Sequence, residues 1–311
     1  MITFDKLKLV ADITAVVNYE ESQFEKIEKG GSRTFKYYQE TPYLLAIKID
    51  YQKREVVVEF TGKVLGKDYP KLISLNTIHQ CFQAINSMGF ITLDIDVMMD
   101  ADVVKCDVTK DIQYDDIPSL TTYVRNHTSS YQRYVCRKLR NSNLVVEKNV
   151  TTRKTKKRMT IYDKGKEMQK VENRRFVEAY GLQGVFDGVC RFELNLNSKE
   201  QIRQALGTSN TKLQAVLSTS ANPIVDFLDD VIDDVVTTPV TMSGRKAYVT
   251  MLVLKDCDYD LEKVEAKMRQ LYPSRGTNIS AIMQPYRQMM EQMNSPEKAN
   301  LWDDVRRQLS E

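Results

Sequence analysis

The chain has 311 residues, of which 42% are hydrophobic, and a formal net charge of +3 at pH 7. Its apolar runs are far shorter than the roughly 20 residues of a membrane-spanning helix, and its five cysteines lack CxxC spacing. Phosphate loops of the GxGxxG or GxxxxGK[ST] type are also absent from the sequence. These features predict a cytoplasmic globular protein without a membrane partner, and they argue against nucleotide-cofactor enzymes and ATPase-type helicases.

The first half of the chain alternates between strand and helix patterns. The expected elements are a strand at 2–10, a hairpin at 43–51 and 54–61, a helix at 77–88 and a strand at 103–114. Side chains two residues apart lie on the same face of a strand. This period places Glu59 opposite the apolar residues of its strand, and it places Asp107 and Asp111 together on one face of theirs.

The second half repeats that order. The expected elements are a helix from 118 to 139, a hairpin at 143–149 and 158–164, a helix at 164–180, a strand at 187–196 and a helix at 199–206. In the strand GVCRFELNL, Glu193 alternates with apolar residues and therefore points away from the apolar layer. In the hairpin, strand spacing puts Tyr162 on one face with Arg158 and Lys164.

The repeated order predicts an α+β fold, in which an antiparallel sheet is built from two related ββαβ halves. Glu59 and Tyr162 fall on the matching second strands of the two halves, and Asp107 and Glu193 fall on the matching third strands. If the halves close into one sheet, we expect these four residues to converge on a single face. The predicted catalytic domain covers residues 1–220.

Residues 221–311 are predicted to form a separate helical domain that binds an origin or braces its neighbour. The segment 223–236 carries five aspartates. A metal site is one interpretation of them, and a solvated acidic helix face is the other, which the helical pattern favours.

Positive charge is concentrated between Tyr131 and Lys170, where 13 Lys or Arg residues oppose three acidic residues. A basic segment on an otherwise acidic protein is typical of a polyanion contact, and the alternative is a solvated charged hairpin. The candidate DNA-binding residues are Arg153, Lys154, Lys156, Lys157, Arg158 and Arg191.

A tyrosine among cations, with acids on neighbouring strands, indicates phosphodiester transesterification. Tyr162 is the candidate nucleophile, and its hydroxyl must lose a proton to attack because a free phenol has a pKa of about 10. Lys164 is expected to steady phosphoryl oxygens or assist proton transfer. Carboxylate oxygens select Mg²⁺ or Mn²⁺. The candidate metal ligands are Asp107, Glu193, Glu59 and Asp111.

Four stretches give the chain a family resemblance. They are VEFTGKVLGKDYPKL (58–72), KCDVTKD (105–111), RMTIYDKGKE (158–167) and GVCRFELNL (188–196). In this order they resemble the filamentous-phage gene II/X replication initiators and the related plasmid Rep proteins of rolling-circle replication. The resemblance implies that Tyr162 is the nicking nucleophile, with Lys164 and Glu167 as companions, and that Asp107 and Glu193 are acidic site residues. The chain lacks the HUH motif of the wider superfamily.

The resemblance also implies a function that spacing alone does not give. Such a protein nicks one strand at a plasmid or phage origin, keeps the 5′ end as a phosphotyrosine, frees a 3′-OH for a host polymerase and later rejoins the strand. The expected partners are single-stranded or supercoiled origin DNA with a host helicase and polymerase, and a homodimer is one option for assembly. The alternatives are a non-cleaving origin-binding initiator and a relaxase-like mobilisation protein.

Overall fold

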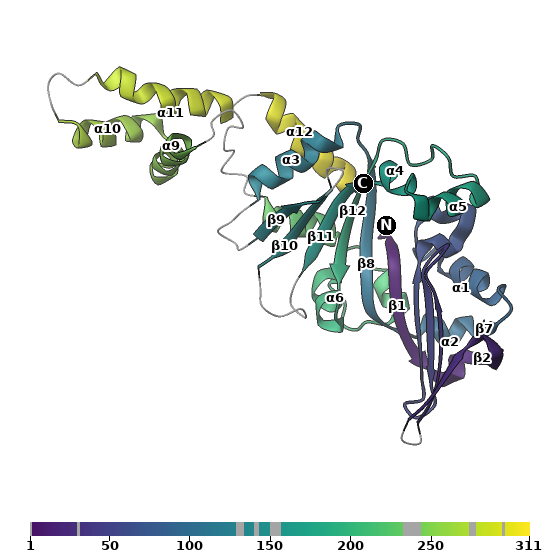
Figure 1. The fold of residues 1–311 in the computed structure, drawn as a ribbon. Coiled ribbons are helices and arrows are strands. Elements are labelled where there is room, and N and C mark those ends of the chain that lie inside the picture. Colours follow the sequence, from purple (N-terminus) through teal and green to yellow (C-terminus); the bar gives the residue numbers. More distant parts are fainter. Residues whose placement is uncertain are drawn as a thin grey trace.

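The computed structural model describes residues 2–29, 32–128, 134–139, 143–149, 157–232, 244–273, 278–293 and 296–311. Among these residues, ten strands form one antiparallel sheet in the order β3-β4-β5-β6-β1-β8-β12-β11-β10-β9 (Figure 1). The strands of this sheet are β1 (Phe4–Asp12), β3 (Glu25–Lys29), β4 (Ser32–Gln39), β5 (Leu45–Asp50), β6 (Glu55–Thr61), β8 (Asp102–Gln113), β9 (Tyr134–Lys138), β10 (Leu144–Lys148), β11 (Arg158–Asp163) and β12 (Val189–Leu196). A small second sheet pairs β2 (Val16–Tyr19) with β7 (Ile91–Leu93). The α+β class and the large antiparallel sheet are therefore confirmed.

One face of the sheet carries the main hydrophobic core. Apolar residues alternate along the strands, so that Leu7, Val58 and Phe192 all point into this layer and are buried. The helices that supply the other side of the core are α1 (Ile78–Asn86), α2 (Ile95–Met99), α3 (Ile117–His127), α6 (Lys199–Leu206), α7 (Leu213–Leu217), α8 (Pro223–Val231) and α12 (Pro296–Ser310).

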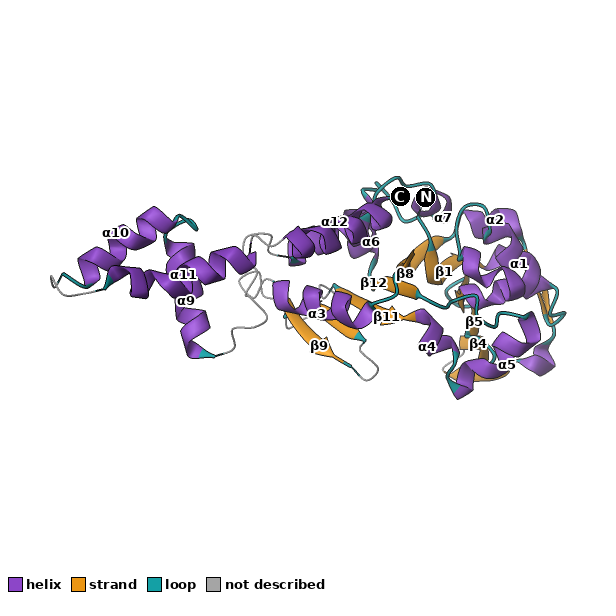
Figure 2. Ribbon diagram, turned by 90° about the horizontal axis from the view of Figure 1, so that it is seen from above, coloured by secondary structure: helices purple, strands orange, loops and turns teal. Residues whose placement is uncertain are grey.

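The opposite face of the sheet is polar and only partly covered. Its cover consists of α4 (Lys164–Met168), α5 (Val171–Tyr180) and the 3-10 segment Gly62–Lys71. These elements share a smaller apolar cluster that includes Tyr69, Phe176 and Phe186. Figure 2 shows α4 and α6 on opposite sides of the sheet.

The helices α9 (Arg245–Asp256), α10 (Leu261–Leu271) and α11 (Ile279–Met293) form a unit with its own core around Val264 and Met289, and Figure 1 shows this unit projecting away from the sheet. In contrast, α8 and α12 bury Phe227 and Trp302 in the core of the sheet. Residues on both sides of the domain boundary expected at residue 221 therefore share the core of the sheet. In the described part of the chain, no helix is long and apolar enough to cross a membrane.

Two expected helices differ from the structure. The helix predicted over 118–139 ends at His127, because Tyr134–Lys138 pairs with β10 as a strand and Arg137 forms an ion pair with Glu147 at 2.9 Å. The helix predicted over 164–180 is divided into α4 and α5. Residues 134–138 form a strand because they pair with β10. The helical spacing within 118–139 gives no information about that pairing.

Candidate active site

The strand register brings most of the predicted site residues onto the polar face of the sheet. On β12, Arg191 lies between Tyr162 of β11 and Asp111 of β8. Glu193 lies between Thr160 and Thr109 in the next row. The face assignments made from strand spacing for Tyr162, Asp111 and Glu193 are therefore confirmed.

The hydroxyl of Tyr162 donates a 2.5 Å hydrogen bond to Oε1 of Glu193. The tyrosine side chain is 8% exposed, whereas Glu193 and Thr160 are partly exposed. The hydroxyl thus lies where the cover formed by α4 ends and the open part of the polar face begins. A carboxylate in direct contact with a phenol is positioned to accept its proton.

Burial and the charge of the nearby Asp5 raise the pKa of Glu193 to about 7. Burial, together with the charge of Glu193, raises the pKa of Tyr162 well above its ordinary value. The phenol is therefore protonated at neutral pH, and the carboxyl changes its charge in the range where a general base is most effective. This pair combines hydrogen-bond geometry with suitable proton affinity.

Lys164 reaches the site as the first residue of α4 and not as the last residue of a strand, which corrects the expected strand geometry. The side chain of Asp163 caps this helix by accepting a hydrogen bond from the backbone N–H of Lys166 at 2.9 Å. The Lys164 side chain is 2% exposed, and its Nζ donates to Glu167 at 2.6 Å and lies 5.1 Å from the ring centre of Tyr69. A buried cation is thus fixed beside the tyrosine and carboxyl pair.

Gly165 allows α4 to pack closely under the loop before β12. A Cβ atom at this position would lie 2.8 Å from the carbonyl oxygen of Phe186, whereas one at Gly62 would lie 3.5 Å from the Tyr69 ring. We expect Gly165→Ala to lower the free energy of unfolding by about 1–3 kcal/mol, because the helix must shift. Urea denaturation checks this, with Gly62→Ala as the matched control. Equal effects of the two substitutions would contradict the proposed close packing.

Arg191 is the centre of a buried ionic network. Its guanidinium donates to both carboxylate oxygens of Asp111, at 2.6 and 2.7 Å, and to Oδ1 of Asp5 and the hydroxyl of Tyr69, both at 2.9 Å. The side chain is 0% exposed. The prediction that Arg191 contacts DNA is therefore wrong for this structure, because the guanidinium is enclosed and faces protein acceptors.

Replacing Arg191 with methionine is expected to lower the free energy of unfolding by about 3–5 kcal/mol, since Asp5 and Asp111 would lose their buried partner. The exposed Arg158 of β11 provides the control, and Arg158→Met should change stability by no more than about 0.5 kcal/mol. Chemical denaturation of both variants measures the difference. An Arg191→Met protein as stable as the control would show that the network contributes little.

Asp5 is a site residue that sequence reasoning missed. Phe4 pairs with Val108 and Lys6 pairs with Asp107, so Asp5 is one extra residue on β1, and this bulge turns it toward the polar face. Burial acts to raise the pKa of Asp5, but the charges of Arg191 and Lys164 outweigh it and lower the pKa. Asp5 is therefore the carboxylate whose charge lies close to Glu193.

The sequence contains a signal for this bulge. Phe4 and Leu7 are both fully buried on the core face, although residues three apart fall on opposite faces of a regular strand. A change of parity within an otherwise alternating strand indicates one inserted residue.

The remaining predicted acids are occupied by protein partners. Glu59 accepts from Lys6 at 2.7 Å and from Lys8 at 3.0 Å, and Asp111 is held by Arg191 as described above. Asp107 accepts from the side-chain amide of Asn195 at 2.7 Å, and burial raises its pKa.

Within the described ranges, no three His, Cys, Asp or Glu side chains are grouped to hold a metal ion. A cage made of all four predicted ligands is therefore not formed. Mg²⁺ sites often use only one or two carboxylates together with substrate phosphates and water. Asp107 and Glu193 fit that smaller requirement, because they are diagonal neighbours across Thr109 on the same face.

The basic hairpin is described only in part. Arg153, Lys154 and Lys156 lie outside the described residues. Arg158 begins β11 opposite Asn195, on the face that carries the site, and it is exposed. Lys157 precedes it and is partly exposed. These two cations therefore remain candidates for phosphate contacts at the edge of the site.

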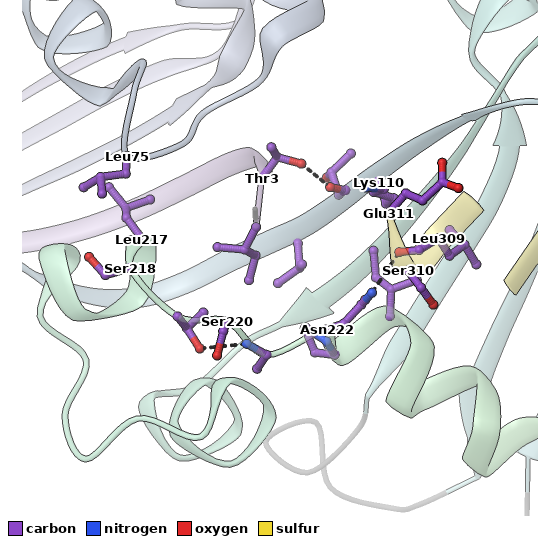
Figure 3. A pocket seen from close by; sticks show the side chains of 17 residues that line it. Thr3, Leu75, Lys110, Leu217, Ser218, Ser220, Asn222, Leu309, Ser310 and Glu311 are labelled. Atoms are coloured by element: carbon purple, nitrogen blue, oxygen red, sulfur yellow. Dashed lines mark hydrogen bonds between the residues drawn. The ribbon is translucent and has the colours of Figure 1, made fainter. Parts of the chain in front are cut away.

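A separate cavity of about 400 Å³ lies between the start of β1 and the end of α12 (Figure 3). Two of its polar side chains serve the backbone: Asn222 donates to the carbonyl of Leu309 at 2.8 Å, and Thr219 donates to the carbonyl of Leu206 at 2.7 Å. This cavity joins the two chain ends and has none of the tyrosine and acid chemistry found on the polar face.

No protein-family model matches the chain, and no curated protein matches it at a significant level. The resemblance to phage and plasmid replication initiators therefore stays a prediction that rests on the four sequence stretches.

Proposed function

We propose that the chain is a rolling-circle replication initiator of a plasmid or phage, which cuts one DNA strand at an origin and later rejoins it. The observation that carries this proposal is the 2.5 Å hydrogen bond from the Tyr162 hydroxyl to Glu193, beside the buried Lys164. A nucleophile, a base and a cation on one face are the groups that transfer of a phosphodiester to tyrosine requires.

In the proposed cut, Glu193 accepts the phenolic proton as the Tyr162 oxygen bonds to phosphorus. The bond from phosphorus to the 3′ oxygen breaks, and the leaving oxygen takes a proton from water to become a 3′-OH. The 5′ phosphate stays on the tyrosine. Rejoining reverses these steps: a 3′-OH attacks the phosphotyrosine, and Glu193 returns its proton to the phenol. No net oxidation or reduction occurs.

The charge of the reacting phosphate is balanced by neighbouring cations. Lys164 is held in place by Glu167, whose other oxygen accepts from Asn173 at 2.6 Å. The ammonium group of Lys164 therefore needs little reorganisation during the reaction. A Mg²⁺ or Mn²⁺ ion held by Asp107 together with phosphate oxygens of the DNA would add Lewis-acid polarisation of the phosphate and would leave Glu193 free to accept the proton.

The order of elements supports an origin of the catalytic sheet from two related ββαβ halves. The hairpin β5–β6 is followed by the 3-10 segment, α1, β7, α2 and β8, and the hairpin β10–β11 is followed by α4, α5 and β12. The third strands, β8 and β12, pair with each other at the centre of the sheet. The halves differ because β1 is inserted between β6 and β8, and because α1 packs on the core face of the sheet whereas α4 and α5 cover the opposite face.

The low exposure of Tyr162 favours a second candidate, a DNA-binding initiator that marks an origin without cutting it. The Tyr162 side chain is only 8% exposed. To reach its hydroxyl, DNA must approach from the side of Glu193, or the cover formed by α4 and α5 must move. If neither occurs, the tyrosine and carboxyl pair serves only to stabilise the fold.

A denaturing gel separates these candidates. The probes are single-stranded oligonucleotides that carry a label at the 3′ end and together cover the sequence of the plasmid or phage that encodes the protein. Each probe would be incubated with the protein and Mn²⁺. The nicking proposal predicts a labelled adduct that survives denaturation, because the protein keeps the downstream fragment. Binding without any adduct on any strand supports the non-cleaving initiator.

A further inference from the structure

The polar face continues beyond the candidate site across four more strands. Cα pairing runs from Lys8 on β1 to Glu59 on β6, then to Ala46 on β5 and Tyr38 on β4. A groove of about 570 Å³ lies along this path. Its size is within the range of known small-ligand sites.

The groove combines a small apolar floor with an exposed aromatic ring. Ala46 and Val57 contribute short side chains to its lining, and the Tyr38 side chain beside them is 66% exposed. The neighbouring Tyr37 instead stacks against Phe90, with ring centres 4.2 Å apart. Tyr38 thus offers an open ring surface on the polar face, as a nucleobase-stacking residue must.

The lysines of this face are arranged unfavourably for the protein alone. Lys36 lies directly opposite Lys48 on the neighbouring strand, and Lys8 lies directly opposite Lys105. Like charges in such cross-strand pairs destabilise a sheet. A bound polyanion would remove that repulsion.

Pairing with acids does not neutralise the lysines. Lys6 and Lys8 both form ion pairs with Glu59, and Lys6 also lies directly opposite Asp107, whereas Lys8 has Lys105 as its cross-strand neighbour on β8. Lys48 is paired with Asp50 at 2.8 Å, and Lys36 lies directly opposite Glu25 on β3, although no ion pair joins Lys36 to an acid within the described residues. Three lysines (Lys8, Lys36 and Lys48) and two acids (Glu25 and Glu59) line the groove, which leaves it one net positive charge and therefore a net attraction for phosphate.

We propose that this groove holds single-stranded DNA continuous with the strand that Tyr162 cuts, with a base stacked on Tyr38 and phosphates at the two lysine pairs. This inference rests on the proposed function. Six strand steps separate β11 from β4 in the sheet order, which corresponds to roughly 29 Å at about 4.8 Å per step. A strand crossing the whole face would therefore be several nucleotides long.

Fluorescence anisotropy with a labelled 20-nucleotide oligothymidine, without divalent ions, tests this groove. Loss of one stacked base corresponds to about 5- to 150-fold weaker binding, and we expect this for Tyr38→Ala. Tyr38→Phe should bind within about twofold of the unaltered chain, because the ring is retained. Tyr248→Ala is the control, since Tyr248 is 64% exposed and lies on α9 in the separate helical unit.

The salt dependence gives a second measurement. Lys36→Gln should reduce the slope of log affinity against log salt concentration by about 0.7, the value for one single-strand phosphate contact. The proposed groove would be rejected if Lys36→Gln left the salt slope unchanged or if Tyr38→Ala bound the oligonucleotide as tightly as the unaltered chain. It would also be rejected if Tyr248→Ala lost as much affinity as Tyr38→Ala.

Failure of the groove and failure of nicking are distinguishable. If the oligonucleotide binds through Tyr38 but no covalent adduct forms with any strand, the groove stands and the nicking proposal fails. If an adduct forms while Tyr38→Ala leaves affinity unchanged, nicking stands and the groove is rejected.

Discussion

Replacing Tyr162 with phenylalanine is expected to abolish the covalent adduct between protein and DNA. The substitution removes the only atom of this side chain that can bond to phosphorus, while the ring that packs near Lys164 is retained. We expect no adduct above background on a denaturing gel. The yield of adduct should therefore fall by at least about 10³-fold relative to the unaltered chain, as activity does when a covalent nucleophile is removed from other enzymes.

Affinity for DNA separates loss of chemistry from loss of folding. Tyr162→Phe should bind the same strands within about twofold, because one buried hydroxyl contributes no phosphate contact. Tyr180→Phe, on the surface of α5, is a control that should keep full adduct formation. A full yield of adduct from Tyr162→Phe would exclude Tyr162 as the nucleophile.

Replacing Glu193 with glutamine is expected to slow adduct formation by about 10²- to 10⁴-fold, the usual contribution of a general base. Glutamine can still accept the hydrogen bond of Tyr162, but it cannot take up the proton. The unaltered chain should react faster as pH rises through about 7, because Glu193 loses its proton there, and the rate should level off above this range. Single-turnover rates across pH 5–9 measure both effects.

Stability provides an independent test of the same residue. The pKa of Glu193 in the folded chain, about 7, lies above the ordinary glutamate value of 4.5. The folded state therefore binds the proton more tightly, and its stability falls as pH rises from 4.5 to 7. The free energy of unfolding of Glu193→Gln should exceed that of the unaltered chain by about 1–3 kcal/mol at pH 8. Near pH 4.5 the two proteins should differ little in stability.

The opposite pattern would change the assignment. If Glu193→Gln leaves the rate and its pH profile unchanged, another group removes the phenolic proton. If the variant is less stable than the parent at pH 8, the carboxylate stabilises the fold as an ion and does not have a raised pKa.

Strand periodicity was sufficient to predict much of the candidate site. Alternation along β12 placed Glu193 on the polar face, and the same rule placed Asp107 and Asp111 on β8. The rule succeeds because side-chain direction in a regular strand depends only on residue number. It also indicated that Tyr162 would share this face.

Other features depend on contacts between distant segments. Asp5 enters the site through a bulge, and Arg191 is buried because acids from β1 and β8 enclose it. The strand at 134–138 forms because β10 offers a pairing edge. Spacing within one segment carries no information about such partners, so Arg191 was predicted as a surface contact and residues 118–139 as one helix.

Mass spectrometry of the trapped adduct tests the central claim most directly. After proteolysis and nuclease digestion, we expect a phosphonucleotide linked to the peptide that contains Tyr162, with the bond on the tyrosine oxygen. A nucleotide attached to any other residue, or a strand that is cut while no peptide carries a nucleotide, would show that Tyr162 is not the nucleophile.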